Sequence, residues 1–206
     1  PSGSMKPTLL IGDYLFVKKW SYGYSKHSLP FSLPLINNRI FYKEPRRGDI
    51  VVFKTPEDNK TDYIKRIIAL PGDKIQVING IIFLNEIPLS KIQINDFLEK
   101  DFSNIIEFKS VAKLNIFSNV SISKDGEVFI SQFEEFLEDK KFKTLDIQNN
   151  SISDNTNLFI VPDDYFFVLG DNRDNSQDSR FKTPGFIPVN NLVGKAWIVF
   201  FSLENS

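Results

Sequence analysis

The chain has 206 residues and a mass of 23.7 kDa, more than one typical domain of about 100 to 150 residues. Hydrophobic residues make up 41% and charged residues 25%, which predicts a globular rather than a disordered chain. The net charge of -1 removes the main electrostatic argument for a nucleic-acid partner. The sequence has no cysteine and a single histidine, His27, which excludes thiol nucleophiles, disulfides and Cys- or His-rich metal sites. We therefore expect no metal and no nucleic acid.

The two ends of the chain show no targeting or membrane-spanning segment. The first ten residues lack the basic and apolar regions of a signal peptide. The longest apolar run, residues 196–201, is far shorter than the roughly 18 residues that cross a bilayer. Because the chain begins with Pro1 instead of Met, we expect a fragment whose upstream part, with any anchor, is missing.

Short apolar runs bounded by Gly, Pro, Asn or Asp predict a mainly β protein. The expected strands cover residues 49–53, 63–70, 74–78, 81–84, 165–169 and 196–201. Asn79-Gly80 separates two of these runs and predicts a hairpin with a type I′ turn, which needs positive φ at both residues. Asp125-Gly126 repeats this chemistry between residues 120–123 and 128–130.

The composition changes along the chain and predicts two domains of antiparallel β-sheet. Residues 1–77 and 160–206 hold nearly all the prolines and the unusual polar strings, whereas 78–159 is rich in Phe, Ile, Asn, Lys and Glu. We expect a discontinuous core domain with a smaller, inserted β-rich domain. Within the insertion, the near-helical spacing of Phe133, Phe136, Leu137 and Lys140 predicts one short helix.

Residues 1–9 form the first string that could carry chemistry. Pro7 and Gly3 disfavour a helix, so we expect a shaped loop that leads into a strand. Ser2 and Ser4 could supply a nucleophilic hydroxyl and a hydrogen-bond donor. The alternative is a frayed terminal coil.

Lys65 is the second candidate, within an apolar run that also contains Arg66. Period-two alternation places Lys65 on the face of Tyr63 and Ile67, and Arg66 on the opposite face, so one cation should lie in apolar surroundings. Burial lowers the pKa of an amine and can make lysine a general base near neutral pH. The alternative is a lysine whose ammonium reaches solvent along its flexible stem.

Residues 170–180 contain three Asp and two Arg, a density that suits a loop bracing a site through charge-assisted contacts. A calcium loop and a solvated turn are alternatives. Counted from Asp171, the EF-hand pattern fails, because Arg173 occupies the third position of the loop and Ser176 the sixth, where Gly is required.

Four strings in this order resemble the type I signal peptidases of bacteria, serine proteases with a Ser-Lys dyad: residues 1–9, 47–53, 63–73 and 170–180. The resemblance implies Ser4 as nucleophile, Lys65 as general base, and the Ser2 hydroxyl with the Ser4 N–H as oxyanion donors. Further roles that it implies are lysine orientation by Ser176, bracing ion pairs Asp171–Arg66 and Asp178–Arg180, and shallow apolar substrate pockets from Ile64, Leu9 and Met5. It implies no metal or organic cofactor.

By this resemblance, the chain would remove N-terminal signal peptides from exported preproteins after small residues, at sites of the Ala-x-Ala type. It would act at the outer, periplasmic face of the bacterial cytoplasmic membrane. We expect the substrate to bind as an added β-strand. Residues 29–42 are apolar and broken by proline, and they either dip into the bilayer interface or cover the core.

Three readings compete with this function. The chain could be another Ser-Lys processing peptidase, a self-cleaving repressor relative, or an inactive β scaffold that binds exported peptides. A triad built on His27 is disfavoured, because a lone histidine in a loop is usually solvated.

Overall fold

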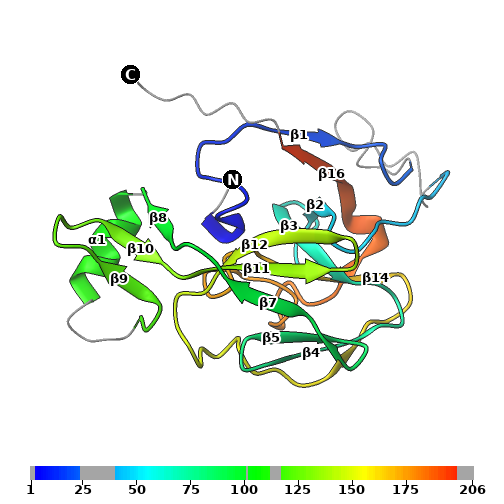
Figure 1. Ribbon diagram of the computed structural model, residues 1–206. Coiled ribbons are helices and arrows are strands. Elements are labelled where there is room, and N and C mark those ends of the chain that lie inside the picture. Colours follow the sequence, from blue (N-terminus) through cyan, green and yellow to red (C-terminus); the bar gives the residue numbers. More distant parts are fainter. Residues whose placement is uncertain (1–2, 24–39, 101, 112–116, 199–206) are drawn as a thin grey trace.

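The structure, a computed structural model, describes residues 3–23, 40–100, 102–111 and 117–198 (Figure 1). It confirms a mainly β protein built of antiparallel sheets. Ser2, His27 and residues 29–39 lie outside the described residues, so the predictions made for them have no structural counterpart.

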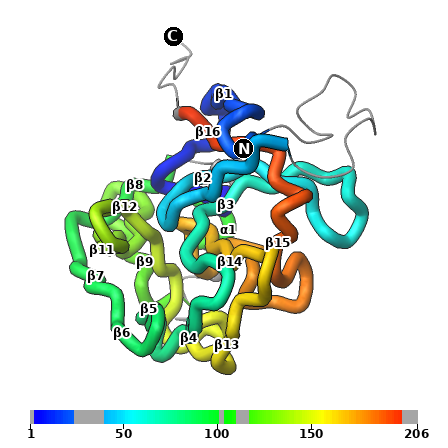
Figure 2. The backbone as a smooth tube through the Cα atoms, turned by 90° about the vertical axis from the view of Figure 1, so that its right-hand side faces the viewer, coloured from blue at the N-terminus to red at the C-terminus, as the bar shows by residue number. Residues whose placement is uncertain are grey.

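The largest sheet contains six antiparallel strands in the order β1-β16-β2-β3-β14-β15. Their bounds are β1 Leu15–Lys18, β2 Ile50–Lys54, β3 Asp62–Ala69, β14 Tyr165–Leu169, β15 Ile187–Pro188 and β16 Leu192–Ile198. All six strands come from the segments that flank residues 78–159. Figures 1 and 2 show β1 and β16 side by side at one end of the molecule and β4 at the opposite end.

Three smaller sheets, β13-β4-β5-β6, β12-β11-β7 and β8-β10-β9, hold the remaining strands. The bounds in the first are β4 Lys74–Ile78, β5 Ile81–Leu84, β6 Ile87–Pro88 and β13 Phe159–Ile160. Those in the other two are β7 Ser90–Gln93, β8 Phe97–Glu99, β9 Val120–Ile122, β10 Val128–Ile130, β11 Gln132–Leu137 and β12 Lys140–Leu145. The helical elements are η1 Gly3–Met5, α1 Phe102–Val111 and η5 Val189–Asn191.

One of the two predicted hairpin turns is confirmed. Asn79 and Gly80 both have positive φ, 49° and 72°, and connect the antiparallel strands β4 and β5. The expectation for Asp125-Gly126 is wrong in detail, because only Gly126 has positive φ, 81°. β9 and β10 are joined by the longer loop 123–127, which closes through a bond from the Gly126 N–H to the Ser123 carbonyl and needs one left-handed residue.

The helix predicted around Phe133 to Lys140 is wrong, because β11 and β12 form a hairpin there. β11 also pairs with β7 on its other edge, so its backbone groups are satisfied in a sheet. The carboxylate of Glu135 on β11 is buried and paired with Arg173, a contact that a helical spacing argument does not consider. The α-helix of the described segments, α1, lies outside that run.

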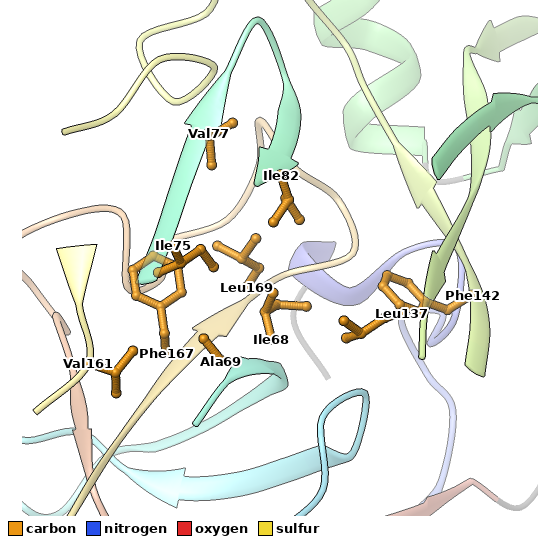
Figure 3. Close-up of a cluster of buried hydrophobic side chains, with 10 residues drawn as sticks. All are labelled: Ile68, Ala69, Ile75, Val77, Ile82, Leu137, Phe142, Val161, Phe167 and Leu169. Carbon is orange, nitrogen blue, oxygen red and sulfur yellow. The ribbon is translucent and has the colours of Figure 1, made fainter. Parts of the chain in front are cut away.

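The hydrophobic cluster in Figure 3 crosses the predicted domain boundary. Ile68 on β3 and Phe167 on β14 pack in one cluster with Ile75 on β4, Leu137 on β11 and Phe142 on β12. The predicted boundaries at 77/78 and 159/160 also fall inside β4 and β13. The division into a core and an inserted domain stays a prediction.

Candidate active site

Ser4 lies in the short 3-10 turn η1, held against the six-stranded sheet. Met5 and Leu9 are fully buried and pack with Val52 and Ile64. This packing anchors the turn on the hydrophobic core. The backbone N–H of Asn172 donates to the Ser4 carbonyl at 3.0 Å, and its side-chain amide donates to the Gly3 carbonyl at 3.1 Å. Residues 3–9 are therefore a fixed turn and not a frayed coil.

Lys65 on β3 brings its amine to within 2.7 Å of the Ser4 Oγ. The side chain does not reach solvent, since Lys65 is only 3% exposed. Its Nζ also donates to the Ile64 carbonyl at 3.1 Å and lies 5.3 Å from the centre of the Tyr63 ring. Burial lowers the pKa of Lys65 to about 8, although the charges of Asp178 and Asp171 act in the opposite direction. An amine with that pKa is partly neutral at physiological pH.

The neighbouring cation, Arg66, is also buried, and it has a carboxylate partner. Its Nε and Nη2 donate to the two oxygens of Asp171 at 2.8 and 2.6 Å. Its Nη1 donates to the Gly48 carbonyl at 2.9 Å, and the guanidinium lies 4.1 Å from the centre of the Phe142 ring. Two adjacent residues on one strand thus bury cations in different ways, one paired with a carboxylate and one against a hydroxyl.

Residues 170–180 are built into the protein and do not form a solvated turn. Arg180 Nε and Nη2 each lie 2.9 Å from an oxygen of Asp178, and Asp178 also accepts from the Gly170 N–H at 3.1 Å. Arg173 pairs with Glu135 on β11 at 2.7 Å. In the described part of the chain, no group of three or more acidic or histidine side chains is placed to hold a metal ion.

Ser176 lies close to Ser4 but does not bond to Lys65 in this structure. Its Oγ is buried and has no hydrogen-bond partner among the described residues. A Cβ on Gly170 would lie 2.2 Å from Ser176 Oγ and 2.6 Å from the Ser4 carbonyl oxygen, so all three residues are tightly packed. The orienting role of Ser176 stays a prediction.

A cleft of about 580 Å³ opens in front of Ser4 and Lys65. Its apolar walls come from Leu15, Val17, Val52 and Ile64 on strands β1 to β3. The prediction that Leu9 and Met5 line substrate pockets is wrong for this cleft, because both are fully buried in the cluster beneath it.

Sequence reasoning missed four polar residues of the cleft, Asp62, Tyr63, Asn175 and Gln177. Tyr63 could have been found, because period-two alternation places it on the face of Lys65. Asn175 and Gln177 flank Ser176 in an irregular loop, where no periodicity indicates which way a side chain points.

Two strand edges border the cleft. β1 is the terminal strand of the six-stranded sheet. On β3, residues 62–65 pair with β2, whereas pairing with β14 covers Arg66, Ile67 and Ala69. Leu15 and Val17 of β1 and residues 62–65 of β3 all line the cleft, so it can receive an extended peptide.

A sequence model of the family described as "Signal peptidase, peptidase S26" matches residues 1–201. The chain belongs to this family. It is 40% identical to the signal peptidase I of Rickettsia typhi over 206 residues, which cover 99% of this chain and 71% of that protein. It is also 40% identical to the signal peptidase I of Rickettsia akari, with 99% and 70% covered.

A solved signal peptidase I from Enterococcus faecalis aligns with 25% identity and a TM-score of 0.38, covering 74% of this chain and 97% of that one. As a member of the signal peptidase family, the chain is a hydrolase that removes signal peptides, and its substrates are secretory preproteins. Within the described residues, no helix is both long and apolar enough to span a bilayer.

Proposed function

We propose that this signal peptidase is a serine endopeptidase in which Ser4 is the nucleophile and Lys65 the general base. The contact of 2.7 Å between the Lys65 amine and the Ser4 hydroxyl carries the proposal. It is supported by the burial of Lys65 and by its pKa of about 8, because only a neutral amine can accept the hydroxyl proton.

In the acylation step, neutral Lys65 takes the proton of Ser4 as its Oγ bonds to the scissile carbonyl carbon. The backbone N–H of Ser4 and, by the family resemblance, the Ser2 hydroxyl stabilise the oxyanion. When the C–N bond breaks, the Lys65 ammonium returns the proton to the departing amine. Water then attacks the acyl-enzyme, with Lys65 again the base, and releases the signal peptide.

The ion pairs Asp171–Arg66 and Asp178–Arg180 act as braces. Asp171 lies one residue before Asn172, which holds the Gly3 and Ser4 carbonyls, so the Arg66 contact fixes the turn that carries the nucleophile. Asp178 ties Gly170 to the same loop. Ser176, packed against Gly170 beside Ser4, is placed to orient the lysine once a substrate enters.

The cleft supports cleavage after small residues. A strand added between β1 and β3 presents alternate side chains to the wall formed by Val52 and Ile64. Ile64 thus keeps its predicted role as a pocket residue, while the other walls come from β1. We infer an Ala-x-Ala type of site from this geometry together with the family resemblance.

We also propose that the chain works against a lipid bilayer, at the outer face of the bacterial cytoplasmic membrane. Tyr14, Phe16, Trp20 and Trp197 are more than half exposed, at 61 to 66%, and lie in or next to the paired strands β1 and β16 at the edge of the sheet. Aromatic side chains of this kind favour the interface between water and lipid. Figure 1 shows β1 and β16 next to each other at one end of the molecule; Leu15 and Val17 of β1 also line the cleft.

The test is cleavage of a preprotein with Ala-x-Ala before its cut site, in detergent, by the parent chain and by Lys65→Ala. Cleavage after the final Ala by the parent, lost in Lys65→Ala but kept in the exposed-lysine control Lys182→Ala, is the expected result. A Lys65→Ala variant with parental activity would overturn the dyad.

Two further readouts separate the competing functions. A serine-directed covalent reagent should label Ser4, whereas a peptide-binding scaffold without a nucleophile would not react. A self-cleaving peptidase would nick its own chain on standing at alkaline pH and leave the preprotein intact.

A further inference from the structure

A second cavity, of about 360 Å³, borders the paired strands β1 and β16 and is lined by five cations. These are Lys18, Lys43, Arg46, Lys140 and Lys195. Only two carboxylates, Glu44 and Asp49, line the same cavity. We refer to these seven residues as the basic pocket. Cations outnumber carboxylates in it, although the whole chain has a net charge of -1.

Asp49 is buried in the basic pocket, and both of its carboxylate oxygens already accept hydrogen bonds. Lys140 Nζ donates to its Oδ1 at 2.9 Å and Lys195 Nζ at 2.8 Å. Its Oδ2 accepts from the Tyr22 hydroxyl at 3.0 Å and from the Arg46 N–H at 3.2 Å. Burial by itself raises the pKa of Asp49, but the bonds from Lys195 and Lys140 hold that pKa below its ordinary value. One buried carboxylate thus faces two ammonium groups.

Lys18 makes the charge imbalance larger. It lies directly opposite Lys195 on the antiparallel strand β16, and like charges at such a position are destabilising. No ion pair with a described residue involves Lys18, Lys43 or the Arg46 guanidinium, and all three residues are exposed. An anion held among these side chains would relieve the repulsion.

The lysine pair Lys18–Lys195 lies next to an aromatic pair, Phe16–Trp197, on the same face of strands β1 and β16. Phe16 pairs with Trp197 and Lys18 pairs with Lys195, so residues two apart on each strand present first rings and then ammonium groups. Phe16 and Trp197 are 66% and 62% exposed. Two residues along a strand correspond to about 7 Å, the order of the separation between the hydrocarbon boundary and the lipid phosphates.

We propose that the basic pocket binds the phosphate headgroup of an anionic phospholipid while Phe16 and Trp197 enter the interface. The ligand chemistry is a phosphate ester, and we commit to the lipid source because the aromatic pair continues directly into the pocket. This inference rests on the proposed contact with a bilayer and adds to it a preference for anionic lipid.

The experiment measures binding of the chain to sedimented vesicles of phosphatidylcholine alone and of phosphatidylcholine mixed with phosphatidylglycerol. The pocket variant is Lys18→Gln/Lys43→Gln/Arg46→Gln, in exposed side chains outside the dyad cleft. The control variant is Lys100→Gln/Lys124→Gln/Lys182→Gln, which removes the same charge from exposed lysines that do not line the pocket.

The parent should bind the mixed vesicles more tightly than the neutral ones. A cation near an anionic surface contributes about fivefold in affinity, so the pocket variant should bind the mixed vesicles about 100-fold more weakly. The control variant should stay within about tenfold of the parent, and neutral vesicles should not distinguish the three proteins. Cleavage of a soluble peptide should be unchanged in the pocket variant.

Three results would overturn the proposal. Equal loss in the pocket and control variants would show unspecific attraction by net charge. Equal affinity of the parent for both vesicles would remove the anionic preference while leaving membrane contact standing. Calorimetric binding of inorganic phosphate to the parent alone, with unchanged vesicle binding in the pocket variant, would make this a soluble-anion site.

Discussion

Lys6 and Glu99 form a buried ion pair, with Lys6 Nζ 2.8 Å from Glu99 Oε1 and side chains only 3% and 2% exposed. Lys6 follows Ser4 by two residues, whereas Glu99 ends β8 in the part of the chain predicted to be an insertion. Asn104 of α1 also donates to Glu99, at 3.1 Å. Residues 78–159, which carry no recognisable motif, therefore help to hold the turn that carries Ser4, the proposed nucleophile.

Breaking this pair from one side should destabilise the protein strongly. Lys6→Met removes the ammonium group but leaves the Glu99 carboxylate buried. We therefore expect a loss of about 3 to 5 kcal/mol in the free energy of unfolding. The double variant Lys6→Met/Glu99→Leu should recover most of that loss, because it buries no charge. Urea unfolding followed by tryptophan fluorescence measures both. A double variant as unstable as the single one would contradict this explanation.

The pH dependence of cleavage should report the Lys65 amine. With a pKa of about 8, roughly one-tenth of Lys65 is neutral at pH 7, so kcat/KM should rise about tenfold per pH unit below pH 8 and level off above it. The measurement is a pH–rate profile with a soluble peptide substrate. A flat profile down to pH 6 would exclude Lys65 as the base.

Stability should depend on pH through the same group. The folded pKa of Lys65, about 8, lies below the ordinary lysine pKa of 10.5, so between these two values the unfolded chain binds more protons and stability rises with pH. Below pH 8 the full penalty of burying the ammonium is present, about 3 kcal/mol.

Lys65→Met removes this penalty. The variant should be more stable than the parent at pH 7, and the difference should shrink as the pH approaches 10.5. The measurement is urea unfolding of the two proteins at several pH values. In the difference between their free energies of unfolding, the contributions of the other titrating groups cancel. A difference that does not change with pH would contradict the lowered pKa.

The two serines of the N-terminal string should differ in kind. Ser4→Ala removes the nucleophile and should abolish covalent chemistry, whereas Ser2→Ala removes one oxyanion donor and should lower kcat about 100- to 1,000-fold. Single-turnover kinetics on one preprotein compares them directly. Equal residual activity in both variants would reverse or remove these role assignments.

Gly170→Ala should disturb the site without touching a reacting group. The added Cβ would meet the Ser4 carbonyl oxygen at 2.6 Å and Ser176 Oγ at 2.2 Å, so the turn that carries the nucleophile must move. We expect kcat to fall at least tenfold, because small displacements of a nucleophile are costly. Gly12→Ala is the control: it has open space around its Cβ and only its φ of 97° to strain, so its kcat should stay parental.

The wrong predictions share a physical cause. Phe133, Phe136 and Leu137 fit a helical period, yet they form a strand, because β11 pairs with β7 on one edge and with β12 on the other. Met5 and Leu9 were expected in substrate pockets from the family resemblance, but Met5 in η1 and Leu9 just after it are buried in the hydrophobic core. Local patterns do not contain the neighbours that a side chain acquires in the fold.

The sequence by itself determined the β class and the Asn79-Gly80 hairpin, because alternation and turn chemistry are local patterns, and the family resemblance of its strings pointed to Ser4, Lys65 and the ion pair Asp171–Arg66. Only the tertiary structure decided that both Lys65 and Arg66 are buried, that Glu99 supports the turn that carries Ser4, and that Lys18 and Lys195 lie opposite each other on the paired strands β1 and β16. Lys6 and Glu99 lie 93 residues apart, and Lys18 and Lys195 lie still farther apart in the chain; sheet register and core packing bring such partners together, and no local pattern records these contacts.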